Sequence, residues 1–136
     1  MKIIVDTNIF ISAVIRDRLP ERIIMMIARR DDIEWIVTEA IVEEYKQVLA
    51  RPKFTIPKQE LARQFVFIDK FTVRIENDAI IDFPRDRKDA KFLACAKAVK
   101  ADYLVTGDRD FSEAQQLITT RIVSAVEFAQ ILGIPA

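Results

Sequence analysis

Residues 1–8 read MKIIVDTN, and this stretch joins a short apolar run directly to an aspartate. The run from Lys2 to Val5 is short and rich in β-branched residues, so it predicts a buried β-strand. Asp6 stands where that strand ends. A carboxylate there costs free energy unless something compensates its charge. Asp6 is therefore either a turn or capping residue or a residue that binds a ligand. The choice between these roles depends on the rest of the sequence.

Strand-like runs alternate with helical patterns along the chain. Strands are expected at residues 2–5, 35–37, 71–75, 103–106 and 121–123. Helices are expected at residues 12–30, 39–50, 58–70, 86–100 and 125–133. Pro20 lies near the first turn of a second helix within the first of these ranges, Thr38 can cap the next helix, and Ser124 with Glu127 forms a capping-box pattern. The alternation predicts an α/β fold with a parallel sheet, in a single domain over residues 1–136.

The composition excludes several kinds of active site. The chain has no histidine, one cysteine (Cys95) and two glycines (Gly107 and Gly133). These counts exclude Ser-His-Asp and Cys-His catalysis, His- or Cys-ligated metals, a disulfide framework and Gly-rich phosphate loops. An enzyme built from this chain would have to use carboxylates, lysines or oxygen-bound metals. Cys95 is most simply a small core residue.

The charge balance and the hydropathy of the chain limit the partners and the cellular location that we expect. The 21 basic residues balance the 21 acidic ones, so any nucleic-acid contact would need a local basic patch. No apolar run approaches the ~20 residues that a membrane span needs, and the start lacks the layout of a signal peptide. We therefore expect a soluble, cytoplasmic protein that makes no use of a membrane.

Acidic residues follow two of the expected strands. Asp6 follows the first strand, and Asp108 and Asp110 follow the run YLVT at residues 103–106. In open α/β sheets, ligands bind in the crevice beyond the carboxyl ends of the strands. These acids are therefore expected at one edge of the sheet.

Two helices are expected to bring further acids to that edge. With ~100° of rotation per residue, Glu44 lies at the border of the apolar face of helix 39–50, whereas Glu43 points to solvent. On helix 86–100, Asp89 lies on or near the apolar stripe and Lys91 falls on the other side. Glu44 and Asp89 are thus the helical acids that can reach inward.

Each acid also has a local explanation. An aspartate after a strand is often a turn residue. Asp86 could be the N-cap of its helix, with Asp89 favoured by the helix dipole, and Glu44 could be solvated and paired with Lys46 or Arg51. These explanations weaken together, because four converging carboxylates would repel one another and raise one another's pKa. Cations usually neutralise such a cluster, and oxygen-only ligands suit one or two Mg²⁺ or Mn²⁺ ions.

Four segments together resemble the PIN-domain family (PilT N-terminus) across essentially the full length. They are MKIIVDTNIFISA (1–13), EEYKQVLARPKF (43–54), DRKDAKFLACAKAVKADYLVTGDRDF (86–111) and VSAVEFAQIL (123–132). The chain is most similar to the VapC-like toxins of toxin–antitoxin systems. The resemblance implies an α/β/α sandwich with a central, mainly parallel sheet. It also implies a Mg²⁺- or Mn²⁺-dependent endoribonuclease, often a dimer, with a cognate antitoxin as a partner.

The resemblance further implies roles for individual residues. The catalytic and metal-binding acids that it matches are Asp6, Glu44, Asp89 and Asp108, with Asp110 as an additional metal ligand. Thr7, Asn8 and Thr106 match supporting polar positions, in which Asn8 orients Asp6 and Thr106 hydrogen-bonds a carboxylate or a water. Ala94 departs from the pattern, because many relatives carry an acid there.

Basic residues near these acids are candidate contacts to RNA phosphates, although each could equally be an ordinary solvated charge. They are Arg51, Lys53, Arg85, Arg87, Lys88 and Arg109. The segment RIIMMIARR at residues 22–30 is apolar nearly all round when wrapped on a helix. Core packing is the stronger interpretation of this segment, and burial against a second subunit or an antitoxin is the alternative.

Two other functions fit the residues less well. A phosphatase of the haloacid-dehalogenase type also begins with a strand that ends in Asp, but it requires a second acid two residues later, where this chain has Asn8. A non-catalytic PIN-fold module that binds metal, RNA or another protein is the main alternative, although such modules typically lose acids that this chain keeps.

Overall fold

The computed structural model describes residues 1–15, 17–76 and 89–135, with the side chains of residues 109–112 outside that description. Its sheet has five strands in the order β3-β2-β1-β4-β5, and every pair of neighbours is parallel. The strands are β1 (Lys2–Val5), β2 (Glu34–Val37), β3 (Val73–Arg74), β4 (Tyr103–Val105) and β5 (Arg121–Val123). The predicted parallel sheet is confirmed.

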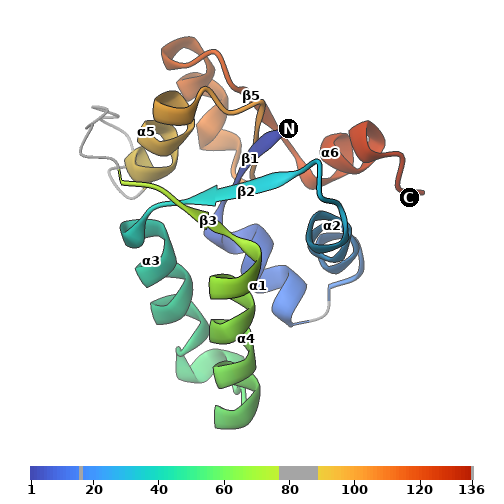
Figure 1. Ribbon diagram of the computed structural model, residues 1–136, viewed down its shortest axis with the longest axis vertical. Helices are drawn as coiled ribbons and strands as arrows, with labels where there is room; N and C mark the ends of the chain where they lie inside the picture. Colours follow the sequence, from blue (N-terminus) through green and yellow to red (C-terminus); the bar gives the residue numbers. More distant parts are fainter. Residues whose placement is uncertain (16, 77–88, 136) are drawn as a thin grey trace.

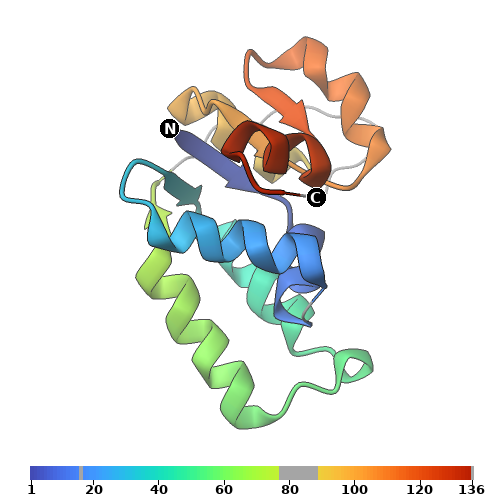
Figure 2. The same ribbon diagram turned by 90° about the vertical axis from the view of Figure 1, so that its right-hand side faces the viewer.

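Helices cover both faces of this sheet. They are α1 (Thr7–Val14), α2 (Arg18–Arg29), α3 (Glu39–Leu49), α4 (Lys58–Phe71), α5 (Ala90–Val99) and α6 (Ala125–Leu132), with 3₁₀ segments η1 (Pro52–Phe54) and η2 (Arg109–Leu117). Figure 1 shows α1, α3 and α4 on one side of the sheet and α5 on the other. The turned view in Figure 2 places α6 beside α2, and these two helices pack together. The chain thus has the expected α/β/α layering.

The core lies between the sheet and the helices that cover it. Phe10 of α1 packs its ring against Trp35 of β2 and Tyr45 of α3, with centroids 5.4 and 5.1 Å apart. All three side chains are fully buried. Cys95 is also fully buried, as expected for a core residue, and burial raises the pKa of its thiol to about 12.

The isoleucines of α2 explain most of the apolar segment at residues 22–30. Ile23, Ile24 and Ile27 are buried in the core, whereas Met25 is 41% exposed. The helix therefore has a buried face and a solvent face, which favours core packing. No helix in the described ranges is both long and apolar enough to span a bilayer.

One helix start differs from the expectation, and two others can be compared with it only in part. The first helix begins at Thr7 rather than Ser12, and the Asp6 carbonyl accepts hydrogen bonds from the backbone N–H groups of Ile9 and Phe10. A second helix begins at Arg18, so Pro20 lies in its first turn as predicted. Within the described residues, α5 begins at Ala90. Its expected start at Asp86 lies outside the described residues.

Two predicted helix caps are confirmed. The Thr38 side chain accepts a hydrogen bond from the Ile41 backbone N–H at 3.3 Å. Ser124 and Glu127 form the reciprocal capping box, with both distances at 3.1 Å.

Candidate functional site

The candidate site lies where the strand order of the sheet reverses. β1 has β2 on one side and β4 on the other, so the chain turns in opposite directions from this central strand. The Asp6 N–H donates to the Val105 carbonyl at 2.9 Å and so joins the ends of β1 and β4. The crevice beyond such a switch point is where ligands bind in open α/β sheets.

A cavity of about 540 Å³ occupies this position. Four of the predicted acids line it, and each comes from a different segment: Asp6 follows β1, Glu44 lies on α3, Asp89 precedes α5 and Asp108 follows β4. We call this cavity the acidic pocket. The structure thus brings the four acids to one crevice, and their catalytic roles stay a prediction.

Asp6 is the acid that the fold encloses most tightly. Its side chain is 4% exposed, and its Oδ2 accepts a hydrogen bond from Thr106 Oγ1 at 2.9 Å. The same hydroxyl oxygen accepts from the Asp108 backbone N–H at 3.0 Å, so Thr106 links two of the acids. The hydrogen bond that was expected from Thr106 to a carboxylate is therefore present.

Burial raises the pKa of Asp6 from its ordinary value of 3.8 to about 6. The negative charges of Glu44 and Asp108 add to this rise, whereas the hydrogen bonds from Thr106 and from the Thr7 backbone oppose it. The sequence predicted a raised pKa through mutual repulsion. In the structure, desolvation is the larger cause and repulsion is a smaller one.

Tyr45, the residue after Glu44 in the chain, holds Glu44 beside Asp6. The hydroxyl of Tyr45 donates to the carbonyl of Val5, the residue directly before Asp6, and so fixes α3 to the end of β1. Nothing in the sequence pattern predicted this contact, because it joins residues 40 positions apart.

Both carboxylate oxygens of Glu44 are hydrogen-bonded. Oε2 accepts from Thr7 Oγ1, and Oε1 accepts from Lys91 Nζ at 2.8 Å. The Glu44 side chain is 20% exposed, so it lies inside the pocket rather than on the open surface.

One expectation about a charged neighbour was wrong, and the alternative pairing of Glu44 with Lys46 is absent from the described contacts. Lys91 was assigned to the side of its helix away from the apolar stripe, but the long side chain of this second helical residue reaches Glu44 across the pocket. Lys46, a candidate partner of Glu44, pairs with Asp69 at 3.9 Å instead. Glu43 is exposed as predicted, yet it also lines the pocket.

The remaining predicted site residues fall into two groups, those that the structure describes and those that it does not. Asn8 and Arg51 are exposed and line the acidic pocket, and their roles stay predictions. Lys53 is exposed, with Nζ 5.0 Å from the centre of the Phe54 ring. The remainder lie outside the description, either as whole residues or as side chains: Arg85, Arg87, Lys88, Arg109 and Asp110.

The donor atoms of the acidic pocket have the right chemistry for Mg²⁺ or Mn²⁺, which prefer carboxylate and other oxygen ligands. Asp6 supports this fit, because its buried carboxylate lies near other negative charges that a cation would offset. No three Asp, Glu, Cys or His side chains among the described residues are already gathered tightly enough to hold an ion. The carboxylates would therefore have to turn toward a common ion.

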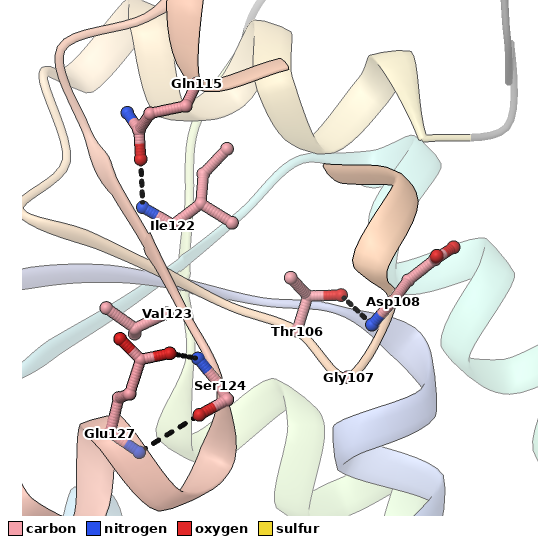
Figure 3. Close-up of a pocket in the computed structure, with 8 residues that line it drawn as sticks. All are labelled: Thr106, Gly107, Asp108, Gln115, Ile122, Val123, Ser124 and Glu127. Atoms are coloured by element: carbon pink, nitrogen blue, oxygen red, sulfur yellow. Dashed lines mark hydrogen bonds between the residues drawn. The ribbon is translucent and has the colours of Figure 1, made fainter. Parts of the chain in front are cut away.

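A second cavity, of about 440 Å³, adjoins the acidic pocket and shares Asp108 with it (Figure 3). We call it the capping cavity. Figure 3 shows the Asp108 carboxylate directed away from Ser124 and Glu127, which bond to each other. Gln115 accepts from the Ile122 backbone N–H at 2.8 Å and donates to the Thr120 carbonyl at 2.7 Å.

Comparison with known proteins identifies the family. The PIN domain profile matches residues 2–110, which is most of the chain, so this protein belongs to the PIN-domain family. The resemblance seen in the sequence is confirmed.

A solved structure has the same fold. It is a chain from the crystal structure of VapBC2 from Rickettsia felis bound to a DNA fragment from their promoter. The two chains are 14% identical and superpose with a TM-score of 0.63 over 91% of this chain and 98% of the other. Comparison with curated proteins gave no match.

Proposed function

We propose that this protein is a metal-dependent endoribonuclease that hydrolyses RNA phosphodiester bonds in the acidic pocket. The observation that carries the proposal is the meeting of Asp6, Glu44, Asp89 and Asp108 in one cavity at the switch point of the sheet. Membership of the PIN-domain family supports a nuclease, since PIN domains are generally nucleases that use divalent metals.

We assign the metal-binding role to Asp6, Asp89 and Asp108, with Asp110 as a further ligand. A bound Mg²⁺ or Mn²⁺ would supply Lewis acidity toward a phosphodiester and lower the pKa of a nearby water. Thr106 holds both Asp6 and the backbone of Asp108, so these two acids are positioned together before any ion binds.

We assign two other pocket residues to orienting the attacking water and to binding the substrate. Glu44, held by Thr7, orients the attacking water or helps to hold a second cation. Arg51 on the rim carries the positive charge that an RNA phosphate needs. Attack in line with the departing oxygen leaves a 5′-phosphate and a 3′-hydroxyl. The absence of histidine from the chain disfavours a 2′-hydroxyl mechanism, which would need an acid and a base near neutral pKa.

The biological setting that we propose is a toxin–antitoxin pair in the cytoplasm, with this protein as the toxin and as a homodimer or higher oligomer. The solved structure with the same fold comes from VapBC2, which supports a protein partner of that kind. Light scattering of the purified protein, alone and with the product of an adjacent small gene, tests both expected associations.

Cleavage of a mixed panel of structured and single-stranded RNAs tests the activity. The assay compares Mn²⁺, Mg²⁺ and EDTA, with wild type beside Asp6→Asn, Glu44→Gln and the control Glu39→Gln. Glu39 lies on the same helix but outside the pocket, in an exposed ion pair with Arg74. We expect metal-dependent cleavage that falls by more than about 10²-fold in the two pocket variants, because even outer-shell partners of metals are worth 10–100-fold.

Cleavage that survives both pocket substitutions would contradict the assignment and indicate a contaminating nuclease. Mn²⁺ binding without cleavage of any RNA in the panel would favour the alternative, a non-catalytic PIN-fold module.

A further inference from the structure

Lys91 places a positive charge inside the acidic pocket. Its Nζ lies 2.8 Å from Glu44 Oε1, and the two side chains are 30% and 20% exposed. The acids of the other described ion pairs are more open to water, from 38% exposed in Glu60 to 64% in Asp32. The Lys91–Glu44 pair is therefore the most enclosed ion pair in the described part of the chain, and solvent screens it least.

The charges of the described residues that line the pocket favour a cation there. The described lining contains five acidic residues (Asp6, Glu43, Glu44, Asp89 and Asp108) and two basic ones (Arg51 and Lys91). Arg51 is exposed on the rim, whereas Lys91 forms a direct ion pair with one of the acids. Repulsion among the carboxylates is thus offset from within the protein at Glu44.

The position of Lys91 is fixed by the fold rather than by a flexible loop. Lys91 is the second residue of α5, and this helix packs against β1, the strand that Asp6 follows. Glu44 faces it from α3, held by the Thr7 hydroxyl on its other oxygen. The ammonium therefore spans the pocket between two anchored helices, where the carboxylate of Glu44 could otherwise bind an ion.

We propose that the Lys91 ammonium is the built-in second cation of this site, and that it occupies the place at Glu44 which a second divalent ion would take. The pocket then binds one divalent ion, among Asp6, Asp89 and Asp108, and Lys91 keeps Glu44 in position for the water. Lys91 is a positioning residue in this account. The inference rests on the proposed function, and it limits the metal content of the site to one ion.

The test is to count bound Mn²⁺ by titration, following the signal of unbound Mn²⁺ by electron paramagnetic resonance. The variants are Lys91→Met, which removes the charge, Lys91→Arg, which keeps it, and Lys97→Met. Lys97 is an exposed residue of the same helix outside the pocket, so its substitution controls for the loss of one positive charge. Thermal denaturation confirms that each variant is folded.

We expect one bound Mn²⁺ in wild type, Lys91→Arg and Lys97→Met, and two in Lys91→Met. Adding Glu44→Gln to Lys91→Met should return the count to one, because the new ion would lose its carboxylate. A purely structural role for Lys91 would lower stability in Lys91→Met without adding an ion.

Two ions in wild type, or a single ion in folded Lys91→Met whatever its affinity, would overturn the inference. These results are distinguishable from a failure of the proposed function. Wild type with two ions and metal-dependent RNA cleavage would retain the nuclease and reject only the role of Lys91, whereas wild type that binds no Mn²⁺ would reject both.

Discussion

The acidic pocket and the capping cavity lie side by side and share Asp108, yet their polar groups are satisfied to different degrees. In the capping cavity, Ser124 and Glu127 satisfy each other and Gln115 bonds to the backbone. Among the described residues that line the acidic pocket, carboxylates outnumber bases, and the buried Asp6 has a raised pKa. Polar groups that satisfy one another stabilise the fold, whereas an excess of one charge indicates a site for a ligand of the opposite charge.

The largest expected effect on stability comes from Asp6→Asn in EDTA. The pKa of Asp6 is raised in the folded state, so its ionised form destabilises the fold at neutral pH. At pH 7.5 the variant should be more stable than wild type by about 1–3 kcal/mol, since one pKa unit corresponds to about 1.4 kcal/mol. Urea denaturation of both proteins across pH measures the difference.

The pH dependence of that difference has a definite sign. Wild type should gain stability as the pH falls through about 6 toward 3.8, because the folded state then takes up a proton that Asn cannot. The gain of Asp6→Asn should shrink over the same range. If the variant is less stable than wild type at pH 7.5, or if the difference in stability does not depend on pH, the ionised Asp6 does not destabilise the fold as we propose.

Bound metal should offset the stability advantage of Asp6→Asn over wild type. An ion that binds only the folded state stabilises it by about 2.7 kcal/mol at 100 times its dissociation constant. Replacing EDTA with such a concentration of Mn²⁺ should raise the melting temperature of wild type and leave that of Asp6→Asn nearly unchanged. An equal rise in both proteins would place the ion elsewhere.

An effect on stability no larger than that of Asp6→Asn, and of opposite sign, is expected from Tyr45→Phe, which removes the bond between α3 and the end of β1. The Val5 carbonyl and the Trp35 indole N–H would both lose a buried partner. The cost should be about 1–3 kcal/mol of the free energy of unfolding. Cleavage by the folded variant should fall about 10-fold, since Glu44 loses its support. Unchanged cleavage would show that the Tyr45 hydroxyl serves stability alone.

The smallest effect is expected in the capping cavity, from Gln115→Ala. The side chain is exposed, so water can replace its bonds to the Thr120 carbonyl and the Ile122 N–H. The loss should be about 1 kcal/mol. RNA cleavage by the folded variant should match wild type. A large loss of cleavage would remove the distinction between the two cavities.

Local patterns in the sequence were enough to predict much of the fold. The apolar run at Lys2–Val5, the cap at Thr38 and the capping box at Ser124 involve residues within a few positions of one another, and all three are present. The start of α1 at Thr7 was missed because β-branched residues such as Ile9 and Ile11 are poor helix formers. Packing against the core overrides that propensity, since both side chains are buried.

The positions of the acids in the site could be predicted from the sequence, but their ion-pair and hydrogen-bond partners could not. Strand ends and helix faces place Asp6 and Glu44 at the same crevice, because the topology of a parallel sheet determines where strand ends meet. The ion pair with Lys91 depends on the relative placement of α3 and α5, which periodicity within one helix cannot give. The Tyr45 bond to Val5 was missed for the same reason.

The most direct test of the central claim is a crystal structure of the protein grown with Mn²⁺, with anomalous diffraction data collected to locate the ion. The account predicts an anomalous peak in the acidic pocket, within about 2–2.5 Å of carboxylate oxygens of Asp6 and Asp89, as expected for a hard divalent ion. An empty acidic pocket at saturating Mn²⁺, or a peak bound only elsewhere on the molecule, would contradict it.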